Sequence, residues 1–372
     1  MKAMYIFLAG LLIYVCGCGG DDPDAAGQGE QTTPVRTIAV VDSIGVELGD
    51  SNYVMGAIEG VAYGPDGNIA VLDCARSCIR IYSPRGEYLR SISRKGNGPG
   101  ELQNVAGLAI SEDGTIALAG EGSGVLGFHA FDYSTGEWIV SRQTQGPPSC
   151  LVGADGNTHI RVDSEFDQSS NEPSVVARVC RWDPEADDPE VIYHEFTFPF
   201  DPSNMGHMIS MLWDACSIAA GNDGRVYAAP YSTEQAEVYA YERDGTEVFS
   251  LNIDYEPVMR SEEELEMELN VLRARASIMD MDPIPLEPEP YKPLIRDLEL
   301  DGDGNLWVHR GTSSVPTFDV FAPDGEPLFT AQVQGEPADG ATWRVHVGSE
   351  GMLAYAEDPA LGYQKVYLLE LQ

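Results

Sequence analysis

VAYGPDGNIAVLD (61–73) contains a short apolar strand pattern, an Asp-Gly pair and a second apolar strand pattern. Asp-Gly between two alternating apolar runs is a strong signal for a β-hairpin, because both turn positions favour a positive φ. The same pattern, with Asp-Gly or Glu-Gly at the turn, recurs in LAISEDGTIALAG (108–120), LVGADGNTHIRV (151–162), IAAGNDGRVYAAP (218–230), LELDGDGNLWVHR (298–310) and VHVGSEGMLAYAE (345–357). The chain therefore contains six internal repeats.

A second hairpin follows the first in most repeats. It reads IRIYSPRGEYLRSI (79–92), HAFDYSTGEWIVSR (129–142), VYAYERDGTEVFSL (238–251) and FDVFAPDGEPLFTA (318–331), with a longer third version at 176–196. Gly67 and Gly114 are 47 residues apart, as are Gly304 and Gly351. Four antiparallel strands at this period are typical of one blade of a β-propeller.

The two ends of the chain complete each other. The sixth repeat ends after VYLLELQ (366–372) with only three strand patterns, whereas RTIAVVDSIG (36–45) precedes the first repeat and is itself strand-like. An N-terminal strand that completes the last blade removes a free sheet edge. We therefore predict an all-β fold over 36–372: a six-bladed β-propeller of four-stranded antiparallel blades, closed by an N-terminal strand, with one helical insertion at about 254–294.

The first residues predict export. Lys2 precedes Met4–Val15, an apolar run of 12 residues, which is too short for a membrane span and typical of a signal-peptide core. Val15-Cys16-Gly17-Cys18 resembles a bacterial lipobox in which Cys18 is lipidated; an ordinary cleaved signal is the alternative. We expect a signal peptide over 1–17, a flexible tether over 18–35, and a protein lipid-anchored to a bacterial membrane, periplasmic or at the cell surface.

The loop GNGPGEL (96–102) between the first and second repeats is the most specific motif of the chain. Together with the repeats and the lipobox, it resembles the bacterial six-bladed β-propeller lipoproteins related to NHL-repeat propellers. The resemblance covers about residues 36 to 372. It implies the fold and a surface location, and it implies no settled activity.

Charge and cysteine content limit the partners. A formal net charge of −38 repels nucleic acid and anionic lipid headgroups, so we expect no nucleic-acid partner and membrane contact through the lipid anchor only. Cys74 and Cys78 are close enough in sequence to form a disulfide after export. The pairing of Cys150, Cys180 and Cys216 stays open, and no cysteine–histidine spacing is typical of zinc.

One face of the predicted ring carries all the long insertions. The hairpin turns within each repeat lie on the opposite face, whereas 163–174, 199–215 and 254–294 fall in connections between strands 2 and 3 or between blades. We call this the insertion-bearing face. SEEELEMELNVLRARAS (261–277) predicts a helix, because Ser261 and Glu264 form a capping box and its leucines make an apolar stripe at Leu265, Leu269 and Leu272. The helix is either a lid or partner surface, or a cover on the ring.

Polar residues at the ends of second strands and at the first blade junction are the candidate ligand-binding residues. They are Asp73, Arg76, Arg94, Lys95, His309, Arg310, Glu357 and Asp358. Solvated strand ends would look the same in sequence.

No catalytic motif is present. RKGNGPGELQ (94–103) lacks the Lys-Ser/Thr of a phosphate-binding loop and leads into a strand. DGDGN (301–305) places Leu306 and Thr312 where a calcium loop needs glycine and glutamate. We therefore expect a binding or scaffolding module for a protein, peptide or glycan at the insertion-bearing face, with no cofactor. The alternative is a metal-dependent hydrolase or lactonase, using calcium, with its site in the central channel.

Overall fold

The computed structural model describes residues 34–122, 125–144, 149–167, 173–278, 285–335, 342–357 and 363–372. The predicted signal peptide, Cys18 and nearly all of the predicted tether lie outside the described residues. Within the described ranges, no helix is long and apolar enough to cross a membrane. Residues Thr33–Gln372 form one compact unit.

The first four blades are separate four-stranded antiparallel sheets, ordered as they follow in the chain. Blade 1 contains β2 (Ile58–Tyr63), β3 (Ile69–Asp73), β4 (Cys78–Tyr82) and β5 (Tyr88–Ile92). Blade 2 contains β6 (Leu102–Ile110), β7 (Thr115–Gly122), β8 (Val125–Asp132) and β9 (Trp138–Gln143). Blade 3 contains β10 (Ser149–Gly153), β11 (His159–Asp167), β12 (Ser174–Trp182) and β13 (Val191–Pro199). Blade 4 contains β14 (Cys216–Ala220), β15 (Val226–Pro230), β16 (Ala236–Tyr241) and β17 (Glu247–Ile253).

The last two blades are joined in one eight-stranded sheet. Blade 5 contains β18 (Ile295–Leu300), β19 (Leu306–Arg310), β20 (Thr317–Phe321) and β21 (Pro327–Val333). Blade 6 contains β22 (Thr342–Gly348), β23 (Gly351–Glu357), β24 (Val366–Leu371) and, as its outermost strand, β1 (Val35–Ile44). The predicted closure by an N-terminal strand is therefore confirmed.

Strand β1 does more than complete blade 6. Its second half pairs antiparallel with β24, from Ile38 opposite Leu371 to Ile44 opposite Val366. Its first residues, Val35 to Ile38, pair in parallel with β21 of blade 5. One strand thus holds two neighbouring blades together at the outer edge of the ring.

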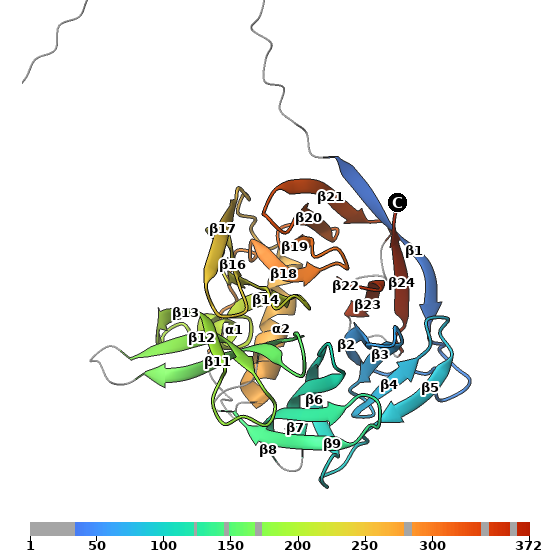
Figure 1. Ribbon diagram of the computed structural model, residues 1–372. Helices are drawn as coiled ribbons and strands as arrows, with labels where there is room; N and C mark the ends of the chain where they lie inside the picture. Colours follow the sequence, from blue (N-terminus) through green and yellow to red (C-terminus); the bar gives the residue numbers. More distant parts are fainter. Residues whose placement is uncertain are drawn as a thin grey trace, which may run out of the picture. The chain divides into compact units, whose positions relative to one another are not determined.

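The six blades follow one another around a ring in chain order (Figure 1). The innermost strands β2, β6, β10, β14, β18 and β22 contact each other in that order, and β22 contacts β2. A buried apolar cluster fills each of the six interfaces between neighbouring blades. Side-chain packing between the sheets therefore contributes to every interface of the ring.

The turns have the geometry that their sequence predicts. Gly114 and Gly304, in the first hairpins of blades 2 and 5, have φ values of 90° and 77°, which glycine adopts without a steric cost. RKGNGPGELQ joins β5 to β6, as expected. Gly100 has a positive φ of 73°, whereas Gly96 is needed for space, because a Cβ there would lie 2.1 Å from the Glu101 carboxylate.

The insertion-bearing face carries two helices, and the sequence predicted one of them. Helix α2 (Glu262–Ile278) begins with the predicted capping box: the Ser261 N–H donates to Glu264 Oε2 at 2.8 Å, and the Glu264 N–H to Ser261 Oγ at 3.2 Å. Helix α1 (Met205–Trp213) lies within 199–215, which was expected to be a loop. The two helices contact each other (Figure 1) through the buried side chains of Ile209, Leu272 and Ala276.

The expected loop 163–174 is shorter than predicted. Strand β11 continues to Asp167 and β12 begins at Ser174, because residues 163–167 pair with 174–178 in an extended hairpin. Residues 168–172 lie outside the described residues.

Candidate functional site

Two ion pairs connect the innermost strands of blades 5 and 6. Asp297 and Glu299 belong to β18, and Arg344 and His346 to β22. Arg344 Nη1 lies 3.6 Å from Asp297 Oδ2, and His346 Nδ1 lies 3.2 Å from Glu299 Oε2. We call these four residues the channel quartet.

Water reaches the channel quartet from inside the ring. The side chains of Asp297 and Arg344 are 34% and 39% exposed, and those of Glu299 and His346 are 16% and 31% exposed. Because the other strands of each blade lie outward of β18 and β22, this exposure faces the central axis. Both strands begin at the insertion-bearing face, so the Asp297–Arg344 pair is the nearer to it. A ligand that enters from that face meets this pair first.

Burial and neighbouring charges shift the pKa values of three residues of the channel quartet. Burial raises the pKa of Asp297, with Arg344 opposing, and burial also raises the pKa of Glu299, with His346 opposing. Burial alone would lower the pKa of His346, but the carboxylates of Glu299 and Asp297 outweigh it and raise the pKa. The channel quartet therefore contains two carboxyl groups, one arginine and a histidine that holds its proton more tightly than a free histidine does.

Of the predicted site residues, His309 lies beside the channel quartet. It stands opposite Asp297 in the ladder between β18 and β19. It is buried and stacks on Phe318 with ring centroids 4.6 Å apart. Burial, followed by the charges of Arg296 and Arg344, holds the pKa of His309 well below its usual value. His309 is thus a buried, neutral imidazole in β19, next to the strand that carries Asp297.

Arg310 is committed to a contact within its own blade. Its Nε and Nη2 donate to the two carboxylate oxygens of Asp319, each at 2.6 Å. The Tyr255 hydroxyl donates to the same carboxylate, and the Arg310 guanidinium lies 5.4 Å from the centre of the Tyr255 ring. This arrangement fastens the connection after β17 to blade 5, and it leaves the Arg310 side chain 34% exposed.

Asp73 is likewise structural. Its side chain is fully buried, and its Oδ2 lies 2.6 Å from Arg80 Nη2. Arg80 also donates to the carbonyl oxygens of Ser51, Asn52 and Val54, at 2.9 to 3.0 Å. The buried pair therefore holds the loop between β1 and β2 over blade 1, which corrects the expectation that Asp73 points toward the channel mouth.

Three of the remaining candidates lie in loops of blade 1. Arg76 and Lys95 are exposed in separate loops of blade 1. Arg94 is also exposed, and its Nε donates to Glu101 Oε1 at 2.8 Å. Glu357 ends β23, but its side chain and all of Asp358 lie outside the described residues.

The predicted disulfide between Cys74 and Cys78 is not formed, and both are free thiols. Cys74 begins the tight turn between β3 and β4, and its thiol donates to the carbonyl oxygen of Val105 at 2.8 Å. Cys78 lies in β4 opposite Asp73. The Cys74 thiol therefore contacts blade 2 through Val105. This corrects the expectation that Cys74 and Cys78 form a disulfide.

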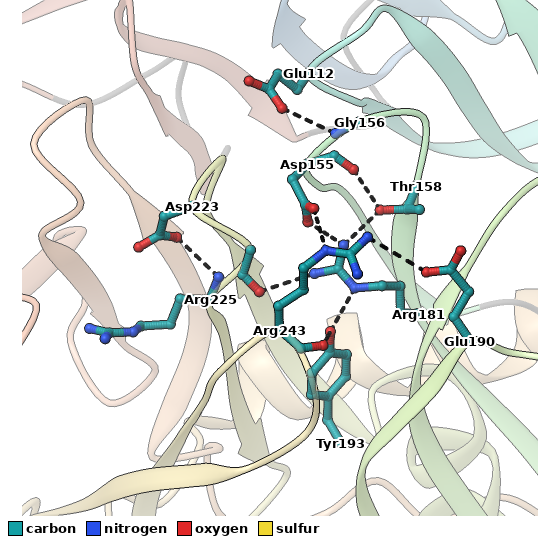
Figure 2. Close-up of polar contacts among 11 residues, drawn as sticks. Glu112, Asp155, Gly156, Thr158, Arg181, Glu190, Tyr193, Asp223, Arg225 and Arg243 are labelled. Atoms are coloured by element: carbon teal, nitrogen blue, oxygen red, sulfur yellow. Dashed lines mark hydrogen bonds and ion pairs between the residues drawn. The ribbon is translucent and has the colours of Figure 1, made fainter.

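A second polar network lies on the opposite face, among the hairpin turns of blades 2, 3 and 4 (Figure 2). The fully buried Arg181 of β12 donates to Tyr193 Oη at 2.6 Å, to Thr158 Oγ1 at 2.7 Å and to the Gly224 carbonyl at 3.0 Å, and it also pairs with Asp155. Arg243, from blade 4, donates to Asp155 at 2.7 Å. Four of the five N–H donors of Arg181 bind protein atoms, and they reach both blade 3 and blade 4, so this network holds the two blades together.

The side chains offer no ligand set for a metal. Across the part of the chain that the structure describes, no group of three or more histidine, cysteine, aspartate or glutamate side chains is arranged to hold a metal ion.

Comparisons with known proteins agree on the fold. Residues 46–170, the first two blades and the start of the third, match the sequence profile of DUF5128, described as a 6-bladed beta-propeller. No curated protein matches the sequence. A protein of Bacteroides fragilis described as a candidate exported protein is 11% identical with a TM-score of 0.50, covering 91% of this chain and 99% of its own.

Two further solved structures are more distant in shape. A gluconolactonase of Xanthomonas campestris is 13% identical with a TM-score of 0.43, covering 89% of this chain and 98% of its own. A regucalcin of Agrobacterium tumefaciens, described as a calcium-binding protein, is 13% identical with a TM-score of 0.39, covering 90% and 96%. Likeness at this level carries no argument about activity. The protein is a six-bladed β-propeller, similar over its first blades to DUF5128.

Proposed function

We propose that the protein is a non-catalytic binding module that holds a ligand at its insertion-bearing face, with a polar group of the ligand in the channel quartet. The channel quartet is the observation that carries this proposal. Its four ionisable side chains are partly exposed, and Arg344 Nη1 lies 3.6 Å from Asp297 Oδ2. A ligand group of either charge can therefore replace one partner of an ion pair.

The charges favour a peptide segment among the protein, peptide and glycan ligands considered. A peptide can bring both an ammonium or guanidinium group and a carboxylate, which complement the acids and Arg344 respectively. An uncharged glycan would leave both pairs in place and gain less.

Polar contacts hold helix α2 of the insertion-bearing face in place. Helix α2 is held to the chain around it by Lys292 Nζ, 2.5 Å from Glu264 Oε1, and by Arg260, which donates to the Glu289 carbonyl at 2.6 Å. Arg275 of α2 donates to Asp214, at the end of α1, at 3.0 Å.

Substitution of the channel quartet tests the proposal. Arrays of short charged peptides and of neutral glycans are screened with the wild type, and the retained ligands are titrated against Arg344→Gln and Asp297→Asn. We expect each change to weaken peptide binding by about tenfold or more, because each removes a charged hydrogen-bond partner. The matched control is Arg225→Gln, on the turn face, which should bind as the wild type does.

Two outcomes would count against the proposal. Unchanged affinity of both quartet variants would remove the site from the channel. Metal-stimulated lactone hydrolysis that is lost in the same variants would favour the hydrolase instead.

We also propose that a lipid on Cys18 anchors the protein to a bacterial membrane, as the lipobox predicts. Cys18→Ser should move the protein from the membrane fraction to the soluble fraction, and Cys16→Ser should leave it on the membrane. Membrane association that survives Cys18→Ser would show another mode of attachment.

A further inference from the structure

Cys150 and Cys216 lie at the same end of two adjacent innermost strands. Cys150 is the second residue of β10 in blade 3, and Cys216 is the first residue of β14 in blade 4. Both strands begin at the insertion-bearing face, and they contact each other. Cys216 is fully buried in the apolar cluster between these blades, and Cys150 packs against the same cluster.

The backbone at Cys150 is distorted. The register between β10 and β11 shifts between Ser149 and Leu151, so Cys150 is the extra residue of a bulge, with a φ of 48° that is rare for a non-glycine residue. A bulge re-aims the side chain of its extra residue. The backbone N–H of Cys216 is directed at the Cys150 sulfur, which shows that the Cys150 thiol reaches blade 4.

Both thiols are free in this structure, and we propose that Cys150 and Cys216 form a disulfide bond that joins the inner strands of blades 3 and 4 when the chain folds in the presence of a thiol–disulfide oxidant. Two S–H bonds break and one S–S bond forms. The two electrons and two protons pass to an incoming disulfide, which is reduced to two thiols.

The bond forms during folding rather than afterwards. In the folded protein, burial raises the pKa of Cys150 to about 12, and burial raises that of Cys216 well above its usual value. Because the thiolate is the reacting species, thiols in the closed ring exchange slowly. The oxidant must therefore act before blades 3 and 4 pack together.

The other cysteines provide internal controls. Cys180 is buried in β12 of the same blade, and Cys74 donates to Val105. Each of the five cysteines of the propeller falls in its own tryptic peptide: 37–76, 77–80, 143–161, 179–181 and 182–225.

The test refolds the purified chain from denaturant in a mixture of reduced and oxidised glutathione. Free thiols are then alkylated, and tryptic peptides are identified by mass spectrometry before and after reduction. We expect 143–161 linked to 182–225, with 37–76, 77–80 and 179–181 alkylated. Alkylation of both 143–161 and 182–225, or a link between any other pair of these peptides, would overturn the proposal.

Thermal unfolding gives a second readout. The linked wild type should melt about 5 °C above the reduced protein, since the bond closes a long loop of the unfolded chain. Cys150→Ser should lose this difference, and Cys180→Ser should keep it. A difference that persists in Cys150→Ser would also overturn the proposal.

Discussion

Replacing Arg181 with methionine tests whether the network on the turn face holds blades 3 and 4 together. The guanidinium is fully buried and binds groups of both blades (Figure 2). Methionine fills a similar volume with apolar atoms, so the change removes the charge and the donors and leaves little empty space.

The expected loss in the free energy of unfolding is about 3 kcal/mol. Removing one partner of a buried ion pair costs roughly 3 to 5 kcal/mol, chiefly because the other charge is left uncompensated. Here Asp155 keeps Arg243 at 2.7 Å and is 17% exposed, so the lower end of the range applies. Most of the loss comes from the Gly224 carbonyl and Tyr193 hydroxyl, which lose the Arg181 donor.

Urea unfolding followed by tryptophan fluorescence measures this loss. The control is Arg243→Met: its side chain is 55% exposed, and solvent screening reduces the contribution of an exposed pair to about 1 kcal/mol or less. A loss below about 1 kcal/mol for Arg181→Met, or an equal loss for Arg243→Met, would refute the reasoning from burial.

Arg181→Met should also change how the stability of the protein depends on pH. Burial alone would raise the pKa of Asp155, but hydrogen bonds from Arg243 and Arg181 lower it below its ordinary value of 3.8. A carboxylate with a lowered folded-state pKa stabilises the fold above the unfolded-state value and loses that contribution as the pH falls through the folded-state value. Arg181→Met should therefore lose less stability than the wild type on acidification below about pH 4.

Two other substitutions test the packing of the ring. Gly153→Ala should destabilise the protein by at least about 3 kcal/mol, because its Cβ would lie 1.9 Å from the Ile110 carbonyl oxygen. The control is Gly156→Ala, in the turn that follows Gly153; with φ +61° and no atom within 4 Å, it should cost roughly 1 kcal/mol. Equal melting temperatures of the two variants would contradict this account. His159 is buried with no hydrogen-bond partner for either ring nitrogen among the described residues, and burial, then Arg161, lowers its pKa well below 6.5, so the wild type should lose stability as the pH falls below 6.5. His159→Phe, which keeps the stack on Phe128, should remove that loss, and parallel stability profiles from pH 8 to 5 would show that His159 is not its source.

The fold could be predicted because its signals are local. Each Asp-Gly or Glu-Gly turn specifies its own hairpin, and the count of strands at the two chain ends requires closure. Helix α1 was missed because 199–215 has no capping box or acidic first turn, and its helix forms by packing on blades 3 and 4. The pairing of β1 with β21 was missed because nothing in a short sequence pattern specifies a parallel partner in another blade.

The candidate site was harder to predict. Asp297-Leu298-Glu299 and Arg344-Val345-His346 alternate charged and apolar residues in the first strand of their repeats, so a signal was present. Which charges meet depends on contacts between blades, which lie outside any one repeat. By contrast, Asp73 forms its ion pair with Arg80, and Arg310 with Asp319, in each case in the next strand of the same blade. Opposite charges across one hairpin would have identified these pairs as internal.

The position of β1 also determines when the protein can finish folding. Its two partners, β21 and β24, lie in the last part of the chain, with Thr330 to Val333 beside its start and Val366 to Leu371 beside its end. Nearly 300 residues must therefore emerge before the first strand acquires a neighbour. Until then the valines of β1 form an unpaired edge that can pair with other chains. A chain that stops before β24 lacks the antiparallel partner of β1, so blade 6 stays incomplete and β1 keeps one edge unprotected.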